Sequence, residues 1–516
     1  QRSLVGSEMC IRDRYKFLCV GILAMGFASC DLDTEPTDKL PQEQLLSDIG
    51  GVEAILNGVY RSFYKTDWSE GYPTENFGPS SVALAGDLMA QDDMQLREFG
   101  NYWFAYDFLR WTRTEINNKS DRPYVWWNMF YQFVNNANVM IASLDKIETS
   151  EVKKQKNLKA QALSLRAYAY FNLVSLYQLT YKGHESSPGV PIYTEPTSIE
   201  TKGNGRGTVE QVYKRINDDL KDAIQLFEEA GLTQSHKSHI DKYVAYGIKA
   251  RVALIQEDWA AASSAAQEAM KKDGLGLMGN DDLLNGFNSI TNKEWMWGSE
   301  IFESQATGWY SFFNHMDAAA GGHAATCRKI ISSALYDAID DNDTRKKWFT
   351  VPTGMTPDEE DEDVNLKPED VSYNQLKFRV KSIGTWNSDY IYMRMAEMYL
   401  IAAEAECRQG NEHFSKAKSL LKEVISYKYE DPSEYENKVD GLQESNDITL
   451  TEENTTSTTL LDEILLQRRI ELWGEGARLL DYRRYVDPEN WELTMMIPMT
   501  EFDGNESLNI ATDQNP

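Results

Sequence analysis

The sequence predicts a mainly α-helical protein, with tetratricopeptide-like helical hairpins in one domain, large irregular loop insertions and little β-structure. Three observations support this fold class: apolar residues recur at helical spacing, two alanine-rich segments resemble each other, and Gly-, Pro- and Asn-rich stretches separate them. The 516 residues are 41% hydrophobic and 26% charged, which is ordinary for globular proteins. The net charge of −29 argues against nucleic acid as a partner, because phosphate backbones require clustered Lys and Arg.

The first recognisable segment, in chain order, is a predicted export signal. Residues 17–28 read FLCVGILAMGFA, without charge, and basic residues precede them. This run is too short to cross a bilayer as a helix, which takes about 20 residues, and it has the features of a secretory signal. Small residues stand directly before Cys30, which resembles a bacterial lipobox and predicts a lipid on that cysteine. An ordinary signal peptide followed by a coincidental cysteine is the alternative.

We therefore divide the chain into three parts. We expect residues 1–29 to be foreign N-terminal residues plus a lipoprotein signal peptide, and residues 30–41, which are polar and end in Pro, to form a flexible tether. Residues 42–516 form a single helical domain. No later segment reaches membrane-spanning length, so we expect contact with the membrane through the lipid anchor only. Ligand-facing insertions are expected near residues 65–125, 270–385 and 427–458.

Two long helices precede the hairpins. From Lys156 to Leu179, apolar residues recur every three or four positions and predict one long helix. The next helix begins after Thr208, because Thr208 and Gln211 have the spacing of a capping box.

The two hairpins span residues 243–269 and 402–424. Alanines at their helix contacts allow two antiparallel helices to approach closely, and the turns fall at Glu257 and Gly410. Ala262 and Ala417 occupy equivalent places but are 155 positions apart, whereas tandem tetratricopeptide repeats recur about every 34 residues. The repeats are therefore interrupted by the insertions.

The cysteines of the domain, Cys327 and Cys407, do not form a disulfide framework that the spacing reveals. We expect two buried, unreactive thiols, although the two could in principle pair.

Four blocks in order resemble the SusD/RagB-like surface lipoproteins of Bacteroidota. They are LSLRAYAYFNLVSLYQL at 163–179 with GVPIYTEP at 189–196, RGTVEQVYKRINDDLKDAI at 206–224, YIYMRMAEMYLIAAEA at 390–405, and LDEILLQRRIELWGEGARLLDYRRY at 461–485. The resemblance implies a lipid-anchored protein of the outer membrane, exposed at the cell surface, that docks on a SusC-like TonB-dependent transporter. It also implies an oligosaccharide ligand, or in some members a peptide, and no cofactor. A helical scaffold for protein partners is the alternative from another class.

Catalytic and metal sites find little support in the sequence. Glu471, Glu475 and Asp481 lie three or four positions from arginines, which predicts intrahelical ion pairs rather than the carboxylate pair of a glycosidase. The motifs G-x-S-x-G and H-E-x-x-H are absent. The pair His236 and His239, and the group His315, His323 and Cys327, lack further metal ligands of evident spacing. The acidic run 358–363 lacks the glycine of a calcium loop and reads as a solvated loop.

Binding is better supported, because sugars present apolar C–H faces beside hydroxyl groups and need exposed rings next to polar side chains. Segments 86–111 and 295–315 combine both kinds of residue, and loops commonly carry binding residues. The predicted ligand-binding residues are Asp87, Asp92, Asp93, Arg97, Trp103, Tyr106, Trp111, Gln305, Trp309, Tyr310, Phe312 and Asn314. By contrast, Trp126, Trp127, Trp259 and Trp297 are predicted to pack inside the protein.

Overall fold

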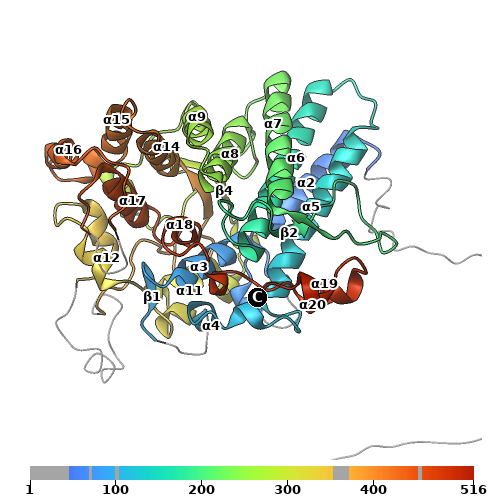
Figure 1. Ribbon diagram of the computed structural model, residues 1–516, viewed down its shortest axis with the longest axis horizontal. Helices are drawn as coiled ribbons and strands as arrows, with labels where there is room; N and C mark the ends of the chain where they lie inside the picture. The colour runs from blue at the N-terminus through green and yellow to red at the C-terminus, as the bar shows by residue number, and fades with distance from the viewer. Residues whose placement is uncertain (1–45, 69–72, 99–103, 352–370, 451–455) are drawn as a thin grey trace, which may run out of the picture. The chain divides into compact units, whose positions relative to one another are not determined.

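Long helices packed in sequence order form the scaffold of the protein (Figure 1). The computed structural model describes residues 46–68, 73–98, 104–351, 371–450 and 456–516. The scaffold helices are α2 (Ile49–Ser62), α5 (Arg122–Leu144), α6 (Val152–Tyr177), α7 (Val209–Ala230), α8 (Lys242–Gln256), α9 (Trp259–Ala269), α14 (Met395–Gln409), α15 (Phe414–Ile425) and α17 (Leu460–Glu471). Each of α5 to α9 packs on the next, and the series continues from α9 to α14 and α15. The predicted helical-repeat fold is confirmed.

The interrupted repeat is continuous in space. Helix α9 ends at Ala269 and α14 begins at Met395, yet the two pack against each other. The alanines of the contacts, Ala262 and Ala417, are fully buried. At the first turn, Glu257 has φ 58° and ψ 27°, the left-handed conformation that commonly ends helices. At the second turn, Gly410 has φ 91° and ψ −156°, a conformation that favours glycine. Both predicted hairpins are therefore present, and the insertion leaves the scaffold and returns to it.

The predicted start of α7 is confirmed, whereas α6 begins earlier than predicted. Thr208 accepts a hydrogen bond from the backbone N–H of Gln211, and the Gln211 side chain accepts one from the Thr208 backbone N–H, which completes the capping box of α7. Helix α6 begins at Val152, four residues before the predicted start, because the polar first turn carries no apolar periodicity.

The β-structure consists of three two-stranded antiparallel sheets in the part of the chain that is described. Strand β1 (Met94–Leu96) pairs with β5 (Lys329–Ile331), β2 (Pro188–Pro191) with β3 (Arg206–Thr208), and β4 (Trp295–Ser299) with β6 (Tyr390–Arg394). The β4–β6 pair places Ser299 opposite Tyr390 and ties the middle insertion to the start of α14.

Short helices make up most of the remainder. They are η1 (Pro73–Glu75), α3 (Pro79–Ala90), α4 (Ala105–Phe108), η3 (Thr112–Thr114), α10 (Asn280–Leu283), η4 (Glu303–Gln305), η5 (Gly308–Tyr310), α11 (Phe312–Met316), η6 (Ala318–Ala320), η7 (Gly322–Ala325), α12 (Ser333–Asp337), η8 (Thr344–Trp348), η10 (Ser426–Lys428), α16 (Pro432–Gly441), α18 (Arg478–Tyr485), η11 (Trp491–Leu493), α19 (Met499–Gly504) and α20 (Ile510–Asp513). Helix α3 differs from expectation: it lies within the predicted ligand-facing insertion but is almost wholly buried.

Helix α3 packs closely on the segment that enters α18. A Cβ placed on Gly476, which has φ 82°, would lie 2.5 Å from the Cβ of Ala83. Only glycine fits this approach, because the contact leaves no room for a side chain and the positive φ disfavours one. Part of the predicted insertion is therefore core.

Cys327 and Cys407 are buried and not joined by a disulfide, as predicted. Residues 43–516 form one compact unit. Within the described ranges, no helix combines the length and the apolar character needed to cross a membrane. Three predicted features, Cys30, Trp103 and the acidic run 358–363, lie outside the described residues.

Candidate ligand-binding surface

Among the described residues, exposed aromatic rings lie in two segments of the insertions. In the described part of the chain, the exposed aromatic side chains are those of Tyr106, Trp111, Phe302, Trp309 and Tyr310. Trp309 and Trp111 are the most exposed of these, at 58% and 57%. All five lie within residues 104–111 and 302–310, whereas the long scaffold helices carry none of them. We define these two segments as the aromatic loops.

One exposed ring of each aromatic loop lies close to a second aromatic ring. In the first loop, the ring centroids of Tyr106 and Trp111 are 5.8 Å apart at an interplanar angle of 35°, and the Trp111 N–H donates to the Tyr106 carbonyl at 2.9 Å. In the second, Trp309 lies 6.5 Å from Trp386, tilted by 37°. The rings thus form small tilted platforms rather than isolated side chains.

A buried cluster of rings supports both loops from beneath. Phe104, which precedes α4, lies 5.0 Å from His315; His315 stacks on His323 at 4.8 Å, and His323 lies 6.0 Å from Trp309. Burial, with the charge of Lys329, lowers the pKa of His323 to about 4 and that of His315 well below its ordinary value. Both imidazoles are therefore neutral at pH 7, and their place in this cluster is that of packed rings.

Phe312 and Asn314 lie behind the second loop, and Gln305, within that loop, is half-buried. The Gln305 side chain accepts a hydrogen bond from the Tyr64 hydroxyl at 3.0 Å. Asn314 is fully buried, and its amide donates to the Trp309 carbonyl at 2.5 Å. Phe312 is buried as well. The expectation of direct ligand contact is therefore corrected for Phe312 and Asn314, and the Asn314 amide holds the backbone that presents Trp309.

The predicted acidic ligands also lie inside the protein. Asp87 accepts hydrogen bonds from the backbone N–H groups of Gly476 and Arg478, at 2.9 and 3.1 Å, and burial raises its pKa to about 7. Asp92 pairs with Arg478, and Asp93 pairs with Arg469. These carboxylates join α3 and β1 to α17 and α18, so their predicted place on the ligand surface is corrected. Arg97 is half-buried at the end of β1, where its backbone N–H donates to the Arg328 carbonyl.

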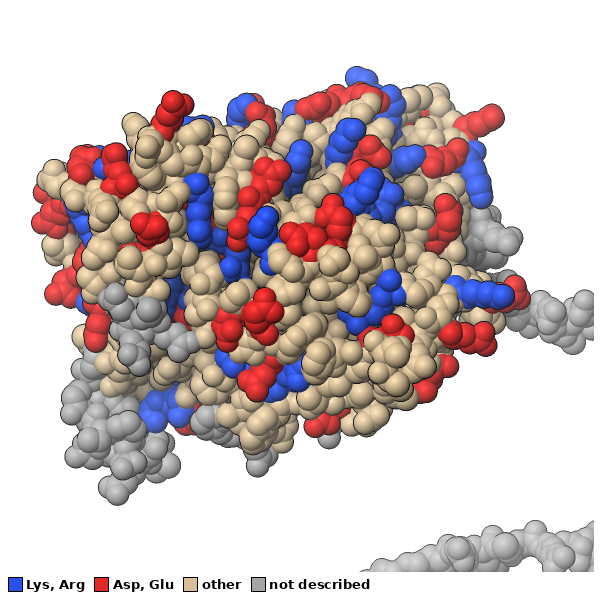
Figure 2. Space-filling model, in the orientation of Figure 1, with Lys and Arg blue, Asp and Glu red and all other residues tan. Residues whose placement is uncertain are grey.

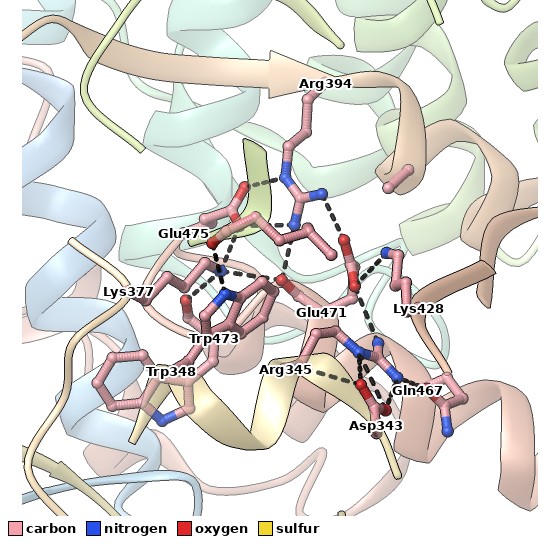
Figure 3. Close-up of polar contacts among 12 residues, drawn as sticks. Asp343, Arg345, Trp348, Lys377, Arg394, Lys428, Gln467, Glu471, Trp473 and Glu475 are labelled. Carbon is pink, nitrogen blue, oxygen red and sulfur yellow. Dashed lines mark hydrogen bonds and ion pairs between the residues drawn. The ribbon is translucent and has the colours of Figure 1, made fainter. Parts of the chain in front are cut away.

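The acids of the C-terminal block belong to a buried ion-pair network (Figure 3). Four cations and four carboxylates meet there, and their side chains are at most 10% exposed: Arg345, Lys377, Arg394, Lys428, Glu294, Asp343, Glu471 and Glu475. Arg394 contacts Glu294 at 2.8 Å, Glu471 at 2.6 Å and Glu475 at 2.7 Å. The formal charges balance, so burial leaves no net charge uncompensated.

This arrangement corrects one detail of the sequence-based expectation. Glu471 and Glu475 pair with distant segments rather than within their own helix, while Asp481 pairs with Arg484 three positions away and with Arg468 of α17. The carboxylates are engaged by cations of the protein itself, which supports the structural interpretation over a catalytic one.

Several other sequence-based interpretations are resolved. Trp126, Trp127 and Trp297 are buried, as predicted, and Trp259 is partly buried beneath the guanidinium of Arg408. Among the described residues, no group of three His, Cys, Asp or Glu side chains could hold a metal ion. On the face drawn in Figure 2, acidic and basic residues are interspersed, without a large basic patch.

The sequence reasoning missed Phe302 and Trp386. Trp386 lies in the turn-forming stretch KSIGTW, just beyond the predicted insertion. The signal that could have identified Trp386 was an aromatic residue inside a polar turn. Turns lie at the surface, so a ring there has few core residues to pack against.

Comparisons with known proteins agree on one family. Residues 32–254 match the SusD-like family described as "Starch-binding associating with outer membrane", and residues 288–515 match the SusD family. SusD-like protein P2 of Formosa agariphila is 24% identical over 531 residues, covering 95% of each chain. SusD-like protein P25 of the same organism is 23% identical over 177 residues, which are 34% of this chain and 31% of that protein.

Solved structures show the same fold. A SusD-like carbohydrate-binding protein from Bacteroides vulgatus superposes with a TM-score of 0.72 at 24% identity, over 90% of this chain and 97% of that one. A laminarin-binding SusD-like protein has a TM-score of 0.65 at 20% identity, over 90% and 98%. Surface glycan-binding protein A from Bacteroides thetaiotaomicron, in complex with laminarihexaose, has a TM-score of 0.61 at 18% identity, over 90% and 98%.

Proposed function

Since this chain belongs to the SusD/RagB-like family, we propose that it is a cell-surface lipoprotein that binds an oligosaccharide and delivers it to a SusC-like TonB-dependent transporter. It acts by binding alone and is not an enzyme. Cys30 carries the lipid that attaches it to the outer membrane.

Within the ranges that the structure describes, all exposed aromatic rings lie in the two aromatic loops, and this observation carries the proposal. Trp111 and Trp309 are more than half exposed although water disfavours apolar surface, and exposed apolar groups gathered in one place commonly mark a binding site. A pyranose ring stacks its C–H face on such a ring while its hydroxyls remain in water. The tilted pairs therefore suit a curved chain of sugar units.

Titration calorimetry with laminarihexaose, maltohexaose, cellohexaose and xylohexaose tests the binding function. Covering one exposed ring buries on the order of 50–100 Å² of apolar surface, worth about 1–2.5 kcal/mol, so Trp309→Ala and Trp111→Ala are each expected to weaken binding about 5- to 70-fold. Leu232→Ala, at an exposed apolar residue beyond the end of α7, is the control and is expected to bind as the unaltered protein does. Binding that survives both Trp variants unchanged contradicts the assignment.

The alternatives give different results in the same experiments. If the protein binds short peptides but none of the oligosaccharides, it is a peptide-binding member of the family. If the protein binds neither oligosaccharides nor peptides, the result favours a protein-interaction scaffold. New reducing ends after incubation with the hexasaccharides indicate a glycosidase.

The anchor is tested separately by cell fractionation. Cys30→Ala is expected to release the protein from the membrane fraction, because lipidation requires the thiol. Retention of the variant in that fraction argues against the lipid.

A further inference from the structure

A groove of about 300 Å³ runs along one face of α5, apart from the aromatic loops. The segment after β2 and helix α19 form its other walls, and α5 and α19 can be located in Figure 1. Its volume lies at the lower end of the range for small-molecule sites. None of the five exposed rings of the aromatic loops lines it, so it is a separate site.

Three aromatic rings follow one another at this groove, with an interplanar angle of 49° between Trp127 and Tyr131 and of 79° between Tyr131 and Tyr193. Trp127 and Tyr131 have centroids 4.8 Å apart, and Tyr131 and Tyr193 are 6.0 Å apart. The polar atom of each ring is bound to the protein. The Trp127 indole donates to Glu501 at 3.0 Å, the Tyr131 hydroxyl donates to the Pro191 carbonyl at 2.8 Å, and the Tyr193 hydroxyl accepts from the Asn204 N–H at 3.1 Å. These bonds fix the ring orientations, and all three residues line the groove.

Amide groups stand beside the rings on the same helix face. Asn128, Tyr131 and Asn135 are spaced by three and four positions, which places them along one side of α5. The carbonyl oxygen of Asn128 accepts from Gln132 at 3.2 Å, and that of Asn135 accepts from the Thr197 N–H at 2.8 Å. Within the described part of the chain, no hydrogen bond engages the NH₂ group of either amide. Two pairs of N–H donors are thus available at the groove.

The opposite wall supplies acceptors. Ser198, Thr201, Thr500 and Glu501 line the groove. The Glu501 carboxylate accepts one hydrogen bond at each oxygen, from the Trp127 indole and from the Asn505 amide, and each carboxylate oxygen has a further lone pair. No Lys or Arg is among the lining residues. A phosphate or an acidic peptide would lack a counter-charge here, whereas a neutral ligand with many hydroxyls matches both the donors and the acceptors.

We propose that this groove is a second carbohydrate-binding site, which takes one or two sugar units of a neutral glycan. The partly exposed rings of Tyr131 and Tyr193 present the stacking surface for the sugar, and the buried Trp127 packs against Tyr131. The amides of Asn128 and Asn135 donate to the sugar hydroxyls, and Glu501 accepts from them. Two sites on one molecule raise the apparent affinity for a polymer that reaches both, because the second contact is made at high effective concentration. The site does not depend on the aromatic loops, and the two can be tested apart.

Blocking the groove without disturbing the core is the decisive test. Gly504 ends α19, lines the groove and is exposed, and a Cβ there would meet nothing within 4 Å. Gly504→Phe therefore places a bulky ring at the groove in open space. Gly441→Phe is the matched control, since Gly441 ends α16, is exposed, and also has nothing within 4 Å. Asn128→Ala is a second variant, which removes one donor.

Saturation-transfer NMR on the full chain reads out weak sugar contact with the same four hexasaccharides. In a Trp111→Ala/Trp309→Ala background, transfer to at least one hexasaccharide is expected to persist. Adding Gly504→Phe is expected to reduce it at least 5-fold and adding Asn128→Ala at least 2-fold, while Gly441→Phe leaves it unchanged. Thermal melting of each variant verifies that the fold is retained.

The outcomes separate the two sites. If the loop variants leave sugar binding unchanged but Gly504→Phe abolishes it, the groove is a carbohydrate site and the aromatic loops are not. If no hexasaccharide contacts the loop-deficient protein, or if Gly504→Phe and Asn128→Ala both leave the transfer unchanged, the groove is not a carbohydrate site. Transfer to a neutral tripeptide with none to the sugars likewise overturns the proposal.

Discussion

The buried ion-pair network predicts a large loss of stability when Glu471 loses its charge. Its carboxylate contacts Lys428 at 2.5 Å, Arg394 at 2.6 Å and Arg345 at 2.9 Å, and all four side chains are fully buried. The change Glu471→Gln keeps the shape of the side chain but removes the negative charge. The three cations then remain in the core with one counter-charge fewer.

The expected magnitude follows from burial. Breaking a buried ion pair by removing one partner costs about 3–5 kcal/mol, because the remaining charge stays desolvated. The entropy of unfolding is about 2.1 cal/mol/K per residue, or roughly 1 kcal/mol/K for a unit the size of residues 43–516, so a cost of about 4 kcal/mol lowers Tm by about 4 °C. Differential scanning calorimetry at pH 7 measures this shift.

The control is a surface ion pair with the same N–O distance as Arg394 and Glu471. Lys214 and Asp218 are also 2.6 Å apart, but their side chains are 69% and 42% exposed. Asp218→Asn is expected to cost less than about 0.5 kcal/mol, because water replaces the lost interaction. Equal shifts of Tm for the two variants would refute the argument from burial.

The pH dependence provides a second check on the network. Lys428, Arg394 and Arg345 hold the pKa of Glu471 well below its ordinary value of 4.5. A carboxylate whose pKa is lowered by folding stabilises the protein above its unfolded pKa, and this contribution is lost as the pH falls. The difference in Tm between the unaltered protein and Glu471→Gln is therefore expected to narrow below about pH 4.5. A difference that stays constant down to pH 3 argues against charge as the cause.

Three further predictions follow from single contacts. Thr208→Ala removes the cap of α7 and is expected to cost about 1 kcal/mol in urea unfolding, whereas Thr208→Ser, which keeps the hydroxyl, is expected to restore most of it. The arginines around Glu404 lower its pKa to about 2, so its stabilising contribution is lost between about pH 4.5 and 2; a Glu404→Gln variant with unaltered acid sensitivity would contradict this. Burial raises the pKa of Cys407 to about 12, so peptide mapping after iodoacetamide at pH 8 is expected to find it labelled only in denaturant, and labelling of the native protein at the same rate would show that it is accessible.

The helical scaffold was predictable because local chemistry specifies it. The capping box at Thr208, the alanines of the two hairpins and their turns at Glu257 and Gly410 are all read within a few neighbouring positions, and each is confirmed. Trp309 and Trp111 were also identified in loop-like sequence, and both are exposed; their contact with a ligand stays a prediction.

Burial in the insertions was not predictable in the same way. Asp87 has the composition of a sugar site but lies in the core, because its partner Gly476 is 389 positions away and no local pattern specifies their contact. Asn314 is buried too, although its partner Trp309 is only five positions away. Sequence spacing likewise suggested ion pairs within one helix for Glu471, whereas the folded chain brings Arg345 and Arg394 to it from other elements.

By itself, the sequence determined the fold class, the repeat hairpins and the segments that carry exposed aromatic rings, since periodicity, capping and composition act over short distances along the chain. The tertiary structure alone decided which polar groups face solvent, how the buried charges balance, and that Trp127, Tyr131 and Tyr193 line a second groove. The physical reason is that burial and hydrogen-bond partnership depend on contacts between residues far apart in the chain.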